Sequence, residues 1–159
     1  MRRSAVFAGV LTMVAASVVT LGQTDNPQVG TWIMNIARST FSSGTGFKSA
    51  TSRIEPIAGG GVKHTIDSVY ADGTSRQYDY TTQYDGRDAP VHGNSPWGDT
   101  VAISHVDANT TRTVYKSHGK VTVTQMSVVS TDRRTRTVTT TGTNPAGQAV
   151  SNVSVYDRR

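Results

Sequence analysis

Cysteine is absent from the 159-residue chain, and leucine and glutamate are nearly absent. Without cysteine the protein has no disulfide framework, no zinc–thiolate site and no thiol nucleophile. Its only leucines are Leu11 and Leu21, and Glu55 is its only glutamate. Leucine and glutamate favour helices, whereas the abundant valine and threonine favour strands. The composition therefore argues against a helical bundle and indicates an all-β protein.

The first 22 residues have the pattern of a secretory signal peptide. Two arginines precede an uncharged, largely apolar run at residues 5–21, and small or polar residues follow it. We expect residues 1–22 to be removed, which leaves residues 23–159 as one domain in the periplasm or outside the cell. Cleavage a few residues earlier also fits the pattern. The run is short for a spanning helix, so an uncleaved membrane anchor is the weaker alternative.

The charge of residues 23–159 is weakly positive. Removal of two of the sixteen basic residues leaves fourteen against eleven acidic ones, so the net charge falls from +5 to +3. Nucleic-acid binding generally needs a basic stripe or face. The densest basic cluster, Arg133, Arg134 and Arg136, is typical of a solvated turn. We therefore expect no nucleic-acid partner.

Turn-forming glycine, asparagine and aspartate residues recur at short intervals beyond residue 29. The runs between them are rich in threonine and valine and have the length of strands, which is typical of an all-β sandwich or barrel. Only residues 36–48 have room for one short helical turn. The pattern predicts strands at residues 30–35, 49–57, 62–70, 74–84, 100–106, 110–117, 120–129, 135–143 and 149–157.

The short turns favour an up-and-down meander in which consecutive strands are antiparallel neighbours. We expect an antiparallel β-barrel of eight to ten strands, because closure removes the exposed edges of an open sheet. Isoleucine, valine and phenylalanine supply only 23 of the 137 residues from 23 to 159. So few aliphatic residues favour a partly empty barrel. The alternative is a small sandwich whose core is filled by threonine methyl groups.

Alternation within the expected strands predicts which side chains point inward. His64 shares a face with Val62 and Ile66, and three tyrosines of residues 74–84 share another. In residues 120–129 the parity of the apolar residues slips, which suggests a bulge near Gln125.

A Gly-x-Trp motif stands at the start of the first expected strand, within residues 26–32. This motif followed by a barrel-like meander resembles the calycin superfamily of lipocalins and fatty-acid-binding proteins. With the segments 84–94 and 142–157 included, residues 23–159 are similar to secreted bacterial lipocalin-like proteins of uncharacterised function. The threonine–aspartate motif of lipocalins has only a loose match, at Thr131 and Asp132.

The resemblance implies that Gly30 and Trp32 close one end of the barrel, with Arg136 or Arg158 packed across the indole ring. Fatty-acid-binding proteins hold a carboxylate with an arginine two residues before a tyrosine on the last strand. Here the order is reversed, as Tyr156 and Arg158. If valines 153 and 155 are buried instead, these two side chains point outward.

Eight side chains are candidates for ligand contact. The tyrosines of residues 74–84 share an inward face, and two arginines are possible charge partners for the ligand. Trp97 lies in the glycine- and proline-rich loop 85–99, as a lid over the barrel mouth or as a plug in its end. The full set is Tyr78, Tyr80, Tyr84, Trp97, Arg112, Arg136, Tyr156 and Arg158.

Catalytic and metal chemistry has little support in the sequence. The four histidines, His64, His92, His105 and His118, show no metal-binding spacing. We expect no catalytic residue, metal or cofactor, although His64 or His105 would be the ligand if the barrel held haem. No serine lies in a nucleophile elbow.

These observations predict an exported, monomeric, non-catalytic protein that binds a small apolar or amphipathic molecule. Two alternatives remain: an envelope structural or interaction protein with a filled barrel, and a barrel enzyme of the isomerase or cyclase type. A cavity below roughly 300 Å³ would speak against small-molecule binding.

Overall fold

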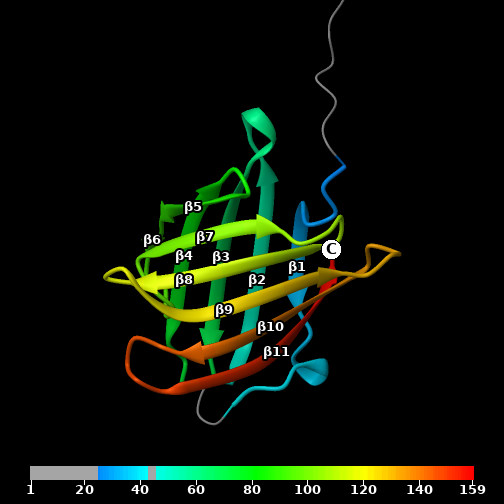
Figure 1. Cartoon of the computed structure of the whole chain (residues 1–159). Coiled ribbons are helices and arrows are strands. Elements are labelled where there is room, and N and C mark those ends of the chain that lie inside the picture. Colours follow the sequence, from blue (N-terminus) through cyan, green and yellow to red (C-terminus); the bar gives the residue numbers. More distant parts are fainter. Residues whose placement is uncertain (1–24, 43–45) are drawn as a thin grey trace, which may run out of the picture.

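An antiparallel sheet of eleven strands curls into a nearly closed barrel in the computed structural model, which describes residues 25–42 and 46–159 (Figure 1). Two short 3-10 turns, η1 (Ile36–Arg38) and η2 (Ala58–Gly60), accompany the strands. The strands are β1 (Gly30–Met34), β2 (Phe47–Pro56), β3 (Val62–Tyr70), β4 (Ser75–Thr82), β5 (Asp85–Pro90), β6 (His92–Gly93), β7 (Thr100–His105), β8 (Thr110–Ser117), β9 (Lys120–Val129), β10 (Thr135–Thr143) and β11 (Ala149–Arg158).

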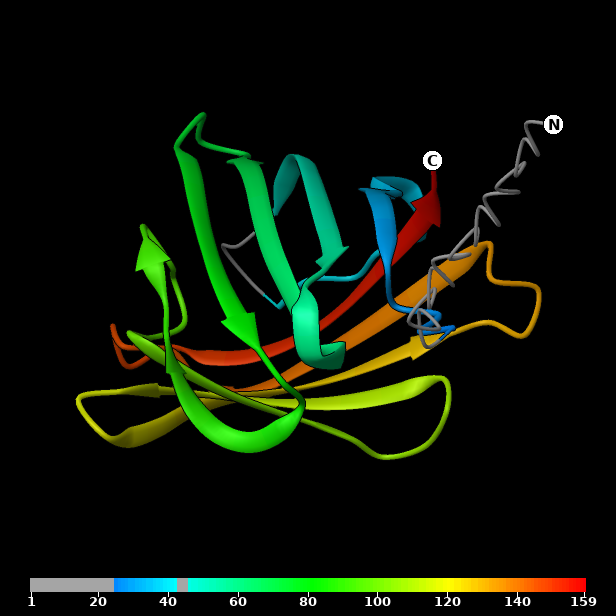
Figure 2. The same ribbon diagram turned by 90° about the horizontal axis from the view of Figure 1, so that it is seen from above.

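The first and last strands pair with each other, which brings the two ends of the meander together. The order around the sheet is β5-β7-β8-β9-β10-β11-β1-β2-β3-β4-β6. Trp32 of β1 pairs with Arg158 of β11 on one side and with Ser52 of β2 on the other. The two outermost strands, β5 and β6, are separated in the chain by Val91 alone. Seen from above, β2 to β4 form one wall and β8 to β10 the opposite wall (Figure 2).

The nine predicted strands all occur, with ends within two residues of the expected positions. The predicted number of eight to ten was wrong because the loop 85–99 contains β5 and β6. The side chains of β5 are mostly exposed and polar, so its pairing with β7 leaves no alternating pattern in the sequence. The expected helical turn is η1, whose first turn is capped by the Asn35 side chain accepting from the Arg38 amide.

The bulge in β9 lies earlier than expected. The register between β8 and β9 shifts within residues 121–124 of β9, which lie before Gln125. Beyond the shift, Val123, Gln125, Ser127 and Val129 point inward, so Val128 is 45% exposed on the outer face. After the bulge, Val129 therefore points inward and Val128 points outward, which is the reverse of what the apolar pattern suggested.

The core consists of two apolar clusters, each built around one tryptophan. Trp32 is fully buried among residues of β1, β2, β3, β9, β10 and β11. Trp97, in the connection between β6 and β7, packs with Tyr115, Val101 and Val123. Tyr84 contacts both clusters. Buried polar side chains lie between the clusters and form the candidate site described below.

The segment 1–22, expected to be a signal peptide, lies outside the described residues. Within residues 25–42 and 46–159, the structure contains no helix with the length and apolarity needed to cross a membrane.

Candidate ligand-binding site

Arg136 lies at the centre of the barrel interior. Strand alternation points it inward together with Val138 and Thr140, and only 5% of its surface is exposed. Burial lowers the pKa of its guanidinium from its usual range, but arginine remains a cation at any physiological pH. Its Nη1 donates to Ser52 Oγ at 2.8 Å, and its Nε donates to Ser127 Oγ at 3.0 Å.

Every partner of Arg136 in the described chain is electrically neutral. Its guanidinium carbon lies 5.3 Å from the centre of the Tyr156 ring and 5.9 Å from that of Trp32. None of the buried side chains in the described ranges is an aspartate or glutamate, and no carboxylate there lies within ion-pair distance of Arg136. The barrel therefore holds a buried positive charge without a counterion from those residues.

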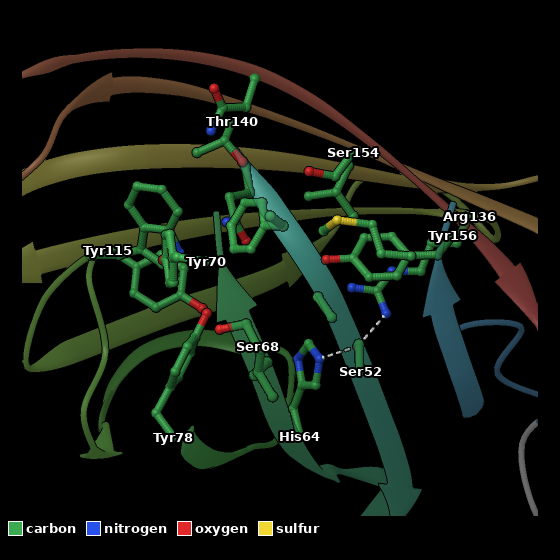
Figure 3. Close-up of a pocket in the computed structure, with 18 residues that line it drawn as sticks. Ser52, His64, Ser68, Tyr70, Tyr78, Tyr115, Arg136, Thr140, Ser154 and Tyr156 are labelled. Carbon is green, nitrogen blue, oxygen red and sulfur yellow. Dashed lines mark hydrogen bonds between the residues drawn. The ribbon is translucent and has the colours of Figure 1, made fainter. Parts of the chain in front are cut away.

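A chain of hydrogen bonds continues from Arg136 through Ser52 to His64 on β3 (Figure 3), and from His64 to Tyr80 on β4. The Oγ of Ser52 lies 2.6 Å from His64 Nε2, and His64 Nδ1 lies 2.6 Å from the Tyr80 hydroxyl. His64 is buried at the centre of the β2–β3–β4 wall. Burial first, and then the positive charge of Arg136, hold the pKa of His64 well below its usual 6.5, so the ring is neutral at pH 7.

The chain also extends to the N-terminal segment. Ser127 donates to the side-chain oxygen of Gln28 at 3.0 Å, and the Gln28 amide donates to the Asn109 carbonyl at 3.0 Å. Gln28, which is buried, thus joins the segment before β1 to the β7–β8 turn and to the side chain that holds Arg136.

Aromatic side chains line the other side of the interior. Tyr78, Tyr80 and Tyr115 are buried, and the Tyr115 hydroxyl interacts with those of both other tyrosines. Burial raises the pKa of all three phenols, so they stay protonated and can donate hydrogen bonds. Trp97 lies against this group.

The cavity between the polar and aromatic sides is small, with a volume of about 50 Å³. A second cavity, of about 20 Å³, lies between Arg136, His64, Tyr80 and Tyr84. Both are far below the ~300 Å³ of a typical pocket for a drug-sized ligand. The expected partly empty barrel is thus wrong for this conformation, because seven tyrosine and tryptophan side chains fill much of the space. The tyrosine and tryptophan residues that line the two cavities are Tyr70, Tyr78, Tyr80, Tyr84, Trp97, Tyr115 and Tyr156.

Six of the eight candidate contact residues lie around these cavities. Tyr78, Trp97, Tyr156 and Arg136 line the larger one, and Tyr80 and Tyr84 join Arg136 at the smaller one. Tyr156 points inward because Ser154 and Asn152 share its face, whereas Val153 is 40% exposed outside the barrel. Their contact with a ligand stays a prediction. Trp97 is buried in the core cluster that contains Tyr115 and Val123.

The two remaining candidates do not reach the cavities. Arg112 points to solvent, because Thr111 and Thr113 on either side of it are buried. Arg158 lies at the barrel end, where its guanidinium donates to the carbonyls of Pro27, Val29 and Arg133. The interpretation of residues 133–136 as a solvated turn was wrong for Arg136, since β10 begins at residue 135 and turns that side chain inward.

The Gly-x-Trp motif lies where β1 pairs with the last strand, and its closure of one barrel end stays a prediction. Trp32 donates its indole N–H to the Gln28 carbonyl at 2.9 Å, and the Arg158 guanidinium carbon lies 4.2 Å from the centre of its ring. Gly30 has a φ of +140°, and a Cβ at this position would lie 2.6 Å from Arg158 Nη1. The positive φ is therefore the main reason that glycine is needed where the arginine crosses the strand.

Sequence reasoning missed the polar members of the network, Ser52, Ser127 and Gln28. Alternation with Ala50 and Ile54 places Ser52 on the inward face of β2, so the pattern contained this information. His64 was expected on an inward face, but its two hydrogen-bond partners come from other strands. Both ring nitrogens are thereby engaged, and His105 lies at the exposed end of β7. No group of three or more histidine, aspartate or glutamate side chains suited to a metal ion occurs in the part of the chain that the structure describes.

No family model matches the chain, and no curated protein matches it. Among solved structures, the wild-type fluorescent protein UnaG is similar, with a TM-score of 0.51 and 17% identity over 83% of this chain and 97% of that chain. The fold is calycin-like. A redesigned β-barrel, mFAP1, determined bound to DFHBI, has a TM-score of 0.43 and 11% identity over 83% of this chain and 95% of its own. The narrower resemblance of this calycin-like barrel to secreted bacterial proteins stays a prediction.

Proposed function

We propose that this protein is an exported carrier or sensor that binds a small amphipathic anion inside its calycin-like barrel without converting it. The charged group of the ligand lies at Arg136, and its apolar part lies against Tyr78, Tyr115 and Trp97. The observation that supports this function best is the buried charge of Arg136 among neutral partners.

The free energy of an isolated buried charge favours binding of an ion of opposite sign. Removing a cation from water costs several kcal/mol, and bonds to neutral hydroxyl groups return only part of this. In the described chain, Nε and Nη1 of Arg136 are hydrogen-bonded, while Nη2 has no such partner. No fully buried side-chain nitrogen or oxygen there lacks a partner, so Nη2 keeps some accessible surface, and Arg136 lines both cavities. A carboxylate or sulfonate placed there forms a charge-assisted hydrogen bond.

The cavity size limits the ligand to a compact one in this conformation. A volume of about 50 Å³ accommodates an acid group with a few carbon atoms, but no long acyl chain. We therefore take propionate and ethanesulfonate as probes, and propionamide as the uncharged probe of matching size.

Substitution of Arg136 tests the proposed function directly. We expect isothermal titration to show binding of propionate and ethanesulfonate to the wild-type protein, and no binding of propionamide. Arg136→Gln keeps amide donors but removes the charge, so we expect at least a tenfold loss of affinity, about the value of one charge-assisted hydrogen bond. Arg112→Gln removes an exposed arginine from the opposite face of the same wall and should bind like the wild type. Absence of anion binding to the wild type would refute the function.

A second candidate is an envelope structural or interaction protein with a filled barrel, and the small volume of the cavity favours it. In that case Arg136 serves the structure alone. The titration separates the two candidates, because a filled barrel would bind neither anion, whereas Arg136→Gln would still change the free energy of unfolding.

A further inference from the structure

The direction of the hydrogen bonds around Ser52 follows from the chemistry of its neighbours. A guanidinium only donates, so Ser52 Oγ accepts from Arg136 Nη1. In the tautomer with the hydrogen on Nδ1, that nitrogen donates to the Tyr80 oxygen at 2.6 Å, and the Ser52 hydroxyl donates to Nε2, also at 2.6 Å. In this state Ser52 has no hydrogen to offer to a ligand in the cavity.

We propose that binding of an anion at Arg136 is coupled to the uptake of one proton by His64, which turns Ser52 into a donor to the ligand. This inference rests on the proposed function and assigns the Ser52–His64 pair as the second half of the anion site. Its ligand class is a compact monoanion that enters the barrel together with a proton.

The proton taken up comes from solvent, and the hydrogen bonds then reverse. Protonated His64 donates from Nε2 to Ser52 Oγ, which still accepts from Arg136. Both lone pairs of Oγ are then used, so the hydroxyl hydrogen of Ser52 must turn away from the ring. Ser52, His64 and Arg136 all line the larger cavity, so the freed hydrogen can point at the ligand. The ligand charge and the added proton cancel, and the barrel interior keeps its net charge of one.

The groups that face His64 from neighbouring elements set the equilibrium. The titratable or charged side chains that line the same two cavities with His64 are Tyr70, Tyr78, Tyr80, Tyr84, Tyr115, Arg136 and Tyr156. None of them is acidic, so the unliganded site offers His64 no negative charge. An anion beside Arg136 both neutralises the repelling charge and attracts the imidazolium, and therefore raises the pKa of His64.

Titration calorimetry with ethanesulfonate tests the coupling, because this anion does not itself titrate near neutral pH. Linkage of one proton predicts that affinity rises by up to about tenfold for each pH unit from about 7.5 down to about 5.5. Buffers of different ionisation enthalpy should report uptake of close to one proton per ligand. His64→Gln should bind ethanesulfonate with an affinity that does not vary over this range. His105→Gln, at an exposed histidine, should keep the wild-type dependence.

Nitrogen NMR of the imidazole rings provides a readout that does not depend on a variant folding. Without ligand, His64 should show the neutral form protonated at Nδ1, and with saturating ethanesulfonate at about pH 6 it should show the imidazolium pattern. Tyr80→Phe should lower the proton uptake, because it removes the acceptor for Nδ1. Binding of ethanesulfonate without proton uptake, or with His64 still neutral, overturns the coupling and leaves the proposed function standing. Absence of binding to the wild type overturns both.

Discussion

At the scale of single residues, several inward-pointing side chains were predicted from strand alternation, and their hydrogen-bond partners were not. Alternation within one strand tells which residues point inward, and it placed Tyr78, Tyr80 and His64 there. The bond from Arg136 to Ser52 joins β10 to β2 across the barrel. Such a contact depends on the register of every intervening strand pair, and a single sequence does not contain this information.

Gly30 provides a test of how the barrel end is closed. A methyl group there would clash with Arg158 Nη1 and would also require a φ of +140°, so we expect Gly30→Ala to destabilise the fold by about 2–4 kcal/mol in urea unfolding. At Gly60, φ is +84° and no atom lies within 4 Å of the added carbon. Gly60→Ala should therefore lower the free energy of unfolding less, because only the positive φ disfavours alanine there. Combining Gly30→Ala with Arg158→Ala should recover part of the loss. Equal effects of the two glycine substitutions would show that Arg158 does not press on this position.

At the scale of elements, the strands with regular alternation were predicted, and the two outermost strands of the sheet, β5 and β6, were not. β5 and β6 are held by backbone pairing, with mostly exposed side chains and a register shift in β5. Neither the hydrophobic pattern nor the strand length marks them in the sequence. From the same properties we expect this segment to open more readily than the rest of the sheet and to offer a route into the barrel interior.

Hydrogen exchange should reveal this difference between elements. β6 pairs with β4 through two residue pairs only, whereas β3 pairs along its whole length on both sides. We expect amides of residues 85–94 to exchange at least about tenfold faster than those of β3 and β8, because local opening has a lower free energy there. Mass spectrometry of exchanged peptides gives the comparison. Equal protection of residues 85–94 and β3 would argue against entry of a ligand through the segment that contains β5 and β6.

At the scale of the whole molecule, the buried charge of the proposed anion site lowers the stability of the unliganded barrel. The interior holds one cation and one histidine that is kept neutral, and both are less favourable there than in water. The folded protein therefore has a pH dependence that the sequence alone does not indicate, since a histidine in a strand gives no sign of whether it will be buried beside an arginine.

The stability of the unliganded protein should fall on acidification in a range where carboxylates do not titrate. In the unfolded chain His64 has a pKa of about 6.5, and in the folded chain its pKa is well below that value. Above pH ~6.5 both states are neutral at this residue, and its contribution to stability is complete. As the pH falls below that point, the unfolded chain takes up a proton first, so stability is lost by up to about 1.4 kcal/mol per pH unit down to the folded pKa.

Urea unfolding at about pH 7.5 and about pH 5 separates the contribution of His64 to stability from that of the aspartates. Aspartates such as Asp72 and Asp107 have pKa values lowered from 3.8, so they change stability only in stronger acid. We expect the wild type to lose stability between the two pH values and His64→Gln to lose less. Ethanesulfonate should stabilise the wild type more at the lower pH than at the higher one, since the bound anion favours the protonated ring. If His64→Gln shows the same loss as the wild type, His64 is already charged or open to solvent in the folded barrel, and its coupling to the anion has no physical basis.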